Sequence, residues 1–137
     1  MGIMRKPGIV ALLFVLVITA SSFIAKQSLK GAWEYAGGIY NGKKEGAPTD
    51  YKLQRKYDKE HFESYSIDSA SAPEKYEAGD YVLHGDTCIE TQTFSGPPSK
   101  VLNIPVPYLY SIRNDTLTLR ATLPSGMVIE EYWKRMK

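Results

Sequence analysis

The sequence predicts an all-β fold, and three observations carry this prediction. Beyond the first 25 residues, no stretch of a dozen residues has apolar side chains at the spacing of an amphipathic helix. The same part of the chain is rich in Tyr, Thr, Val and Ile, which favour strands. Gly, Pro, Asn and Asp interrupt it at short intervals, as turns require. Together these features are typical of a sandwich or a barrel.

Eight candidate strands follow one another along the chain. In order they are GAWEYAG (31–37), YKLQRKYD (51–58), HFESYSID (61–68), GDYVLH (79–84), TCIETQTF (87–94), PYLYSIR (107–113), TLTLRATL (116–123) and MVIEEYWKR (127–135). The Gly-Asp pair at 85–86 and the Asn-Asp pair at 114–115 predict tight hairpins between sequential strands.

Alternation of side chains assigns faces to the last two strands. One side of the segment 116–123 is apolar and the other is polar, which indicates a core face and a solvated face. The apolar side carries Leu117, Leu119, Ala121 and Leu123. In the final strand one side carries Ile129, Glu131, Trp133 and Arg135, so a carboxylate and a guanidinium accompany a tryptophan.

Two segments look irregular. Residues 40–50 (YNGKKEGAPTD) are polar and contain Gly and Pro, so we expect a mobile loop after the first strand. Residues 95–107 contain four prolines, which cannot donate hydrogen bonds to a sheet. We therefore expect a long crossing or an edge segment there.

The first 25 residues have the three parts of a secretory signal peptide. Arg5 and Lys6 precede an apolar stretch at 8–18, and small residues follow. Cleavage after Ser22 fits the small-residue rule slightly better than cleavage after Ala25. The prediction is an exported protein, periplasmic or secreted, with one domain over 26–137; an uncleaved membrane anchor is the alternative.

The charge balance and the cysteine count bear on two features, a nucleic-acid partner and an internal disulfide. Of the 17 Lys and Arg residues, two lie in the signal, which leaves 15 against 15 acidic residues. This balance gives no reason to expect nucleic acid as a partner. Cys88 is the only cysteine, so an internal disulfide is ruled out, and its place in an alternating segment predicts a half-buried small residue.

Residue patterns for catalysis or metal binding are absent from the sequence. His61 and His84 lie far apart at strand ends, and no GxSxG or glycine-rich phosphate loop is present. Two catalytic carboxylates can be distant in the sequence and adjacent in the fold, so Glu63, Glu90 and Glu131 are the candidates for such a pair. The prediction is a protein that is not an enzyme, with no cofactor.

Basic residues gather around the first loop and the second strand. They could attract an anionic glycan or a lipid headgroup, but Glu45, Asp50 and Asp58 interrupt them, so we expect a solvated surface. The cluster consists of Lys43, Lys44, Lys52, Arg55, Lys56 and Lys59.

Gly31 and Trp33 begin the first strand, and Arg135 ends the last. In a closed barrel the first and last strands are neighbours. Trp33 can then lie across one end, Gly31 lets the chain bend inward, and Arg135 can stack on the indole ring. We predict that these three residues seal one end of the barrel.

This arrangement resembles the lipocalin-like (calycin) barrels. Their first-strand Gly-x-Trp is similar to Gly31-Ala32-Trp33, and their barrel-closing arginine is similar to Arg135. The order of Gly-x-Trp, "GDYVLHGDT", "NDTLTL" and "EEYWKR" also resembles short secreted bacterial lipocalin-like proteins of unknown function. The resemblance implies an up-and-down barrel with an interior site. Unlike typical secreted lipocalins, the chain is short, has no cysteine pair and leaves no room for a C-terminal helix.

Binding of a small apolar or amphipathic ligand inside the barrel is the leading functional prediction. Aromatic side chains line pockets well, and the candidate lining residues are Tyr35, Tyr81, Glu131 and Trp133. The alternative is a filled barrel that presents residues 40–50 or 95–107 to an envelope protein or a glycan. A hydrolase with paired carboxylates is a third hypothesis.

Overall fold

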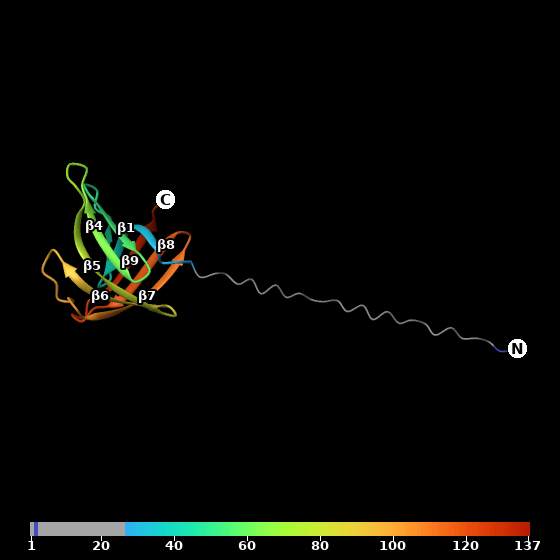
Figure 1. Cartoon of the computed structure of the whole chain (residues 1–137). Helices are drawn as coiled ribbons and strands as arrows, with labels where there is room; N and C mark the ends of the chain where they lie inside the picture. Colours follow the sequence, from blue (N-terminus) through green and yellow to red (C-terminus); the bar gives the residue numbers. More distant parts are fainter. Residues whose placement is uncertain (1, 3–26) are drawn as a thin grey trace.

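The computed structural model of the chain describes residue 2 and residues 27–137. The predicted signal peptide therefore lies outside the described residues, apart from Gly2. The described part forms one antiparallel sheet that closes on itself, because β9 pairs with β1 (Figure 1). Its strands are β1 (Gly31–Tyr40), β2 (Lys43–Gly46), β3 (Lys52–Tyr57), β4 (His61–Ile67), β5 (Glu74–His84), β6 (Thr87–Ser95), β7 (Pro105–Arg113), β8 (Thr116–Thr122) and β9 (Val128–Arg135). The predicted all-β barrel of eight strands is confirmed, with β2 as an additional strand.

The predicted faces of β8 and β9 are also confirmed. Leu117 and Leu119 are completely buried, whereas Arg120, on the opposite face of the strand, is exposed. On β9, Ile129 and Trp133 are buried. The apolar side of each strand therefore faces the barrel interior, as the two-residue period of a strand requires.

Residues 40–46 form a hairpin, so the expectation of a mobile loop over 40–50 was wrong there. Asn41 and Gly42 have positive φ angles of 49° and 81°, which suits a two-residue turn between right-twisted strands. Tyr40 then faces Lys43, and β2 pairs with the second half of β1 as far as Gly37 and Gly46. The first half of β1 pairs with β3 instead, so β2 and β3 follow one another along the same edge of β1, with residues 47–51 between them.

The expectation for the proline-rich segment 95–107 was a long crossing or an edge segment. Its last residues begin β7, at a point where that strand is an edge, so the second alternative is confirmed there. Pro105 and Pro107 belong to β7 and face β6, but pairing of β7 with β8 begins only at Leu109. In the same register Pro107 would face Thr122, and proline has no N–H with which to extend that ladder. The prolines therefore lie where β7 has a neighbour on one side only, and β7 separates from β8 there.

Trp33 lies at one end of the barrel and is fully buried. Its indole Nε1 donates to the carbonyl oxygen of Leu29 at 2.9 Å, and the Arg135 guanidinium carbon lies 4.2 Å from the ring centroid. Arg135 also donates to the carbonyl oxygens of Ser28, at 3.0 Å, and Lys30, at 3.3 Å. The segment before β1 is thus fastened across this end of the barrel, which we call the plugged end.

Gly31 lets the chain turn into this plug. Its φ of +123° is a conformation that residues with a side chain rarely adopt. A Cβ at Gly31 would lie 3.5 Å from the nearer terminal nitrogen of Arg135, which is ordinary contact. The requirement for glycine therefore comes from the backbone and not from lack of space.

Candidate ligand-binding site

A cavity of about 240 Å³ lies at the other end of the barrel, where β1 ends and β2 begins. Its lining includes the end of β2 and the segment that joins β2 to β3. Five of the ten lining residues are aromatic. The lining consists of Tyr35, Tyr40, Glu45, Gly46, Pro48, Tyr51, Leu53, Tyr76, Glu131 and Trp133. We call this the open-end cavity.

Glu131 and two tyrosines form a hydrogen-bonded chain in the cavity. Tyr40 donates its hydroxyl to Glu131 Oε2 at 2.9 Å, and the hydroxyls of Tyr35 and Tyr40 are 2.6 Å apart. The other carboxylate oxygen, Oε1, has no hydrogen-bond partner in the described part of the chain. Burial is the main cause that raises the pKa of Glu131, with Arg55 and Tyr40 acting against it.

Trp133 forms a further part of the cavity lining. Its ring lies 5.2 Å from that of Tyr35 at an interplanar angle of 59°. The residue is only 2% exposed, yet its indole Nε1 has no hydrogen-bond partner among the described residues. A buried N–H without a partner costs free energy, and the surrounding side chains close this one off from solvent.

Arg55 lies inside the barrel, which corrects its assignment to a solvated basic surface. It is 5% exposed and forms a buried ion pair with Glu90, whose Oε2 also accepts a hydrogen bond of 2.7 Å from the Tyr57 hydroxyl. The guanidinium lies over the Phe62 ring at 4.4 Å. Alternation could have revealed this, because Arg55 shares the interior side of β3 with Tyr57.

The barrel interior carries more negative than positive groups. Arg55 interacts with Glu90, with Glu77 at 3.6 Å and, through space, with Glu131. One guanidinium therefore serves three carboxyl groups. Burial raises the pKa of Glu90 despite Arg55, and both Glu77 and Glu131 add to that rise.

The structure brings three of the four predicted lining residues together. Tyr35, Glu131 and Trp133 line the open-end cavity, whereas Tyr81 does not. Tyr81 is buried toward the plugged end, where its hydroxyl donates to the carbonyl oxygen of Asp58 and its ring meets that of Tyr57 edge-on. Tyr40 and Tyr76 are lining residues that the sequence did not reveal, since Tyr40 comes inward only through a bulge between Tyr35 and Gly37.

The remaining candidates for chemistry are dispersed. Glu63 bonds with Tyr65 and Lys75 near the surface, and His61 pairs with Asp80. Cys88 is completely buried, not half-buried, and burial raises the pKa of its thiol. Within residues 27–137, no three His, Cys, Asp or Glu side chains are placed to hold a metal ion. The same residues contain no helix that could cross a membrane.

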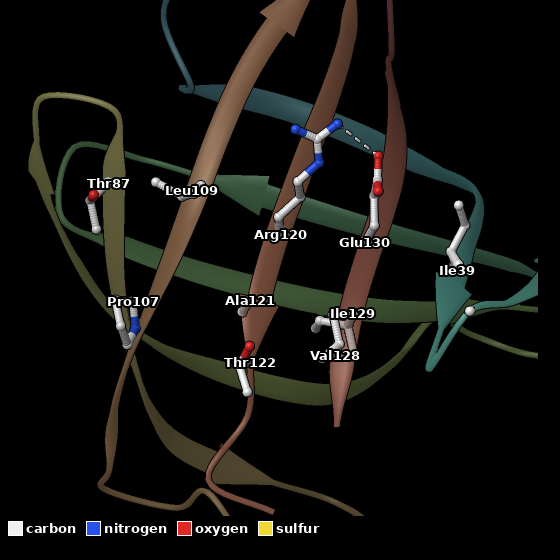
Figure 2. A pocket seen from close by; sticks show the side chains of 11 residues that line it. Ile39, Thr87, Pro107, Leu109, Arg120, Ala121, Thr122, Val128, Ile129 and Glu130 are labelled. Carbon is white, nitrogen blue, oxygen red and sulfur yellow. Dashed lines mark hydrogen bonds and ion pairs between the residues drawn. The ribbon is translucent and has the colours of Figure 1, made fainter. Parts of the chain in front are cut away.

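A second hollow, of about 530 Å³, lies on the outer face of the barrel. Figure 2 shows its side chains on β6 to β9 and on β1, with Arg120 and Glu130 joined by an ion pair of 3.0 Å. Leu109 and Val128 are 59% and 55% exposed, respectively. The hollow lies beside the separation of β7 from β8. We call it the outer groove, and it is lined by Ile39, Gly42, Thr87, Pro107, Leu109, Arg120, Ala121, Thr122, Val128, Ile129 and Glu130.

Comparisons with known proteins support the fold. No protein-family model and no curated protein matches the chain. An uncharacterized protein from Bacteroides eggerthii is similar in structure over 80% of this chain and 100% of that chain, with 16% sequence identity and a TM-score of 0.56. A variant of the fluorescent protein UnaG covers 80% of this chain with 96% of its own length, at 13% identity and a TM-score of 0.41, too low to carry an argument. This first likeness concerns the fold alone, a closed antiparallel barrel.

Proposed function

We propose that this protein is a non-enzymatic binding protein that holds a small amphipathic ligand in the open-end cavity. The observation that carries the proposal is the convergence of Tyr35, Glu131 and Trp133 on one cavity, opposite the end that Trp33 and Arg135 plug. Aromatic side chains together with a few polar groups that fix orientation are the usual lining of a small-molecule site. The volume of about 240 Å³ suits a small ligand or one end of a longer one.

We also propose export to the periplasm or the exterior, which rests on the composition of residues 1–25. The resemblance to short secreted lipocalin-like proteins agrees with this location. Mass measurement of the chain recovered from its own cells tests it. A mature terminus at Phe23 or Lys26 supports cleavage, and a full-length chain in the membrane fraction contradicts it.

A cavity-filling variant tests the binding function. Leu53 lines the cavity, while its neighbour Lys52 points outward and is exposed. Leu53→Trp adds a ring to the cavity and should weaken binding of the neutral fluorescent probe N-phenyl-1-naphthylamine by about tenfold or more. Lys52→Trp places the same ring outside and should leave binding unchanged. Equal binding by both variants, or none by the unaltered protein, contradicts the proposal.

The outer groove favours a second candidate function, an interaction module for a partner protein. Exposed apolar side chains gathered in a groove of about 530 Å³ are typical of interaction surfaces. Photo-crosslinking from position 109 in cells tests this function. A defined partner whose crosslink is lost in Val128→Lys supports it, and crosslinks to no defined protein count against it.

A further inference from the structure

The open-end cavity has acidic and aromatic side chains but no basic one. Glu45 and Glu131 line it together with four tyrosines and Trp133, and no Lys, Arg or His is among its lining residues. The lysines of the 40–50 segment are thus not part of the cavity wall. An anionic ligand group placed here would meet carboxylates and ring faces, both of which repel negative charge.

The charge balance of the barrel interior also disfavours an anionic ligand group. Arg55 forms ion pairs with Glu90 and Glu77 and acts on Glu131 only through space, so Glu131 has no ion pair of its own among the described residues. Oε2 of Glu131 accepts the hydrogen bond from Tyr40, but Oε1 is not hydrogen-bonded among the described residues. A carboxylate that is partly buried and incompletely paired gains most from a cationic partner.

Trp133 contributes an aromatic ring to the cavity wall. Its buried Nε1 has no acceptor among the described residues. A tryptophan ring is also the aromatic surface that attracts organic cations most strongly. The cavity therefore combines a carboxylate and aromatic rings within about 240 Å³.

We propose that the ligand enters the open-end cavity with a cationic head, an ammonium or methylated ammonium group, which contacts Glu131 and the rings of Tyr35, Tyr76 and Trp133. This inference rests on the proposed function and names the ligand class for the same site. The apolar part of the ligand then extends toward Leu53 and Pro48 at the cavity opening.

Three probes of equal length test the inference: octylammonium, octan-1-ol and octanoate. They share an apolar tail and differ in the charge of the head. Isothermal titration calorimetry at neutral pH and low salt should show octylammonium binding about tenfold more tightly than either other probe. Glu131→Gln keeps the shape and the Tyr40 contact, and should abolish this advantage. Glu63→Gln, which removes a carboxylate near the surface, should retain it.

The outcomes separate the inference from the proposed function. Equal binding of all three probes overturns the cationic head and leaves amphipathic binding in place. Preference for octanoate also overturns it. Binding of none of the three, under conditions in which thermal melting shows a folded protein, overturns both proposals. An advantage for octylammonium that survives in Glu131→Gln shows that the cation is bound elsewhere, and contradicts the assigned site.

Discussion

At the residue scale, the ion pair between Arg55 and Glu90 connects two strands across the barrel interior. Arg55 comes from β3 and Glu90 from β6, and Tyr57 holds the second oxygen of the carboxylate. Breaking a buried pair by removing one partner leaves a charge without compensation, whereas replacing both partners with apolar groups is often tolerated. The pair is therefore a device for specifying the interior rather than a large net source of stability.

Truncation of Arg55 alone should be strongly destabilising. We expect Arg55→Leu to lower the free energy of unfolding by about 3–5 kcal/mol at neutral pH, because Glu90 loses its partner. The double variant with Glu90→Leu should recover most of that loss. Urea denaturation of both variants measures the difference. A loss below about 1 kcal/mol for the single variant would show that the ion pair contributes little to the stability of the barrel interior.

Glu131 should make stability depend on pH. Burial raises its pKa above the ordinary value of 4.5, with Glu77 adding to the rise and Arg55 and Tyr40 opposing it. The folded state then holds the proton to higher pH than the unfolded state does. This contribution to stability is complete below the unfolded pKa, and it is lost as pH rises through the folded pKa.

Comparison with Glu131→Gln isolates this effect. Between pH 4.5 and neutral pH, the variant should become progressively more stable relative to the unaltered protein. Denaturation midpoints measured at several pH values give the comparison. A stability difference that stays constant with pH, or that moves in the opposite direction, would contradict the raised pKa.

The plug is the device that matters at the scale of elements. Arg135, at the end of β9, bonds to the segment before β1 and covers the Trp33 ring. We expect Arg135→Met to lower the free energy of unfolding by about 1–2 kcal/mol, through loss of the cation–π contact and the hydrogen bonds. Hydrogen exchange at residues 29–31 should accelerate most. Lys134→Met, at the exposed neighbouring position, is the matched control, and equal effects in both variants would exclude a special role for the plug.

The whole barrel could be predicted from the sequence because its strands alternate clearly and its hairpin turns are short. Leu117 and Leu119 on one face of β8 are an example of this. The hairpin at Asn41-Gly42 was missed because β2 has an entirely polar, exposed sequence and no apolar alternation, although an Asn-Gly pair is a strong turn signal. Local composition favoured a loop over that signal.

The candidate site was predictable only in part, since its lining also depends on the bulge in β1 and on the break between β2 and β3. Tyr35, Glu131 and Trp133 come from adjacent strands of predictable orientation. The position of Tyr81 along the barrel depends on strand tilt and register, which alternation does not specify. Arg55 was missed because its charge and its basic neighbours outweighed the alternation of β3. The outer groove lies where the ladder between β7 and β8 stops at Leu109, short of Pro107.

At the scale of the whole molecule, one end of the barrel is plugged and the other holds the open-end cavity, which we propose as a ligand site. Native mass spectrometry of the protein, purified gently from the cells that make it, tests this arrangement most directly. We predict a reproducible added mass that is lost on denaturation and is absent from Leu53→Trp. A bare protein mass for the unaltered chain would contradict a ligand in the barrel.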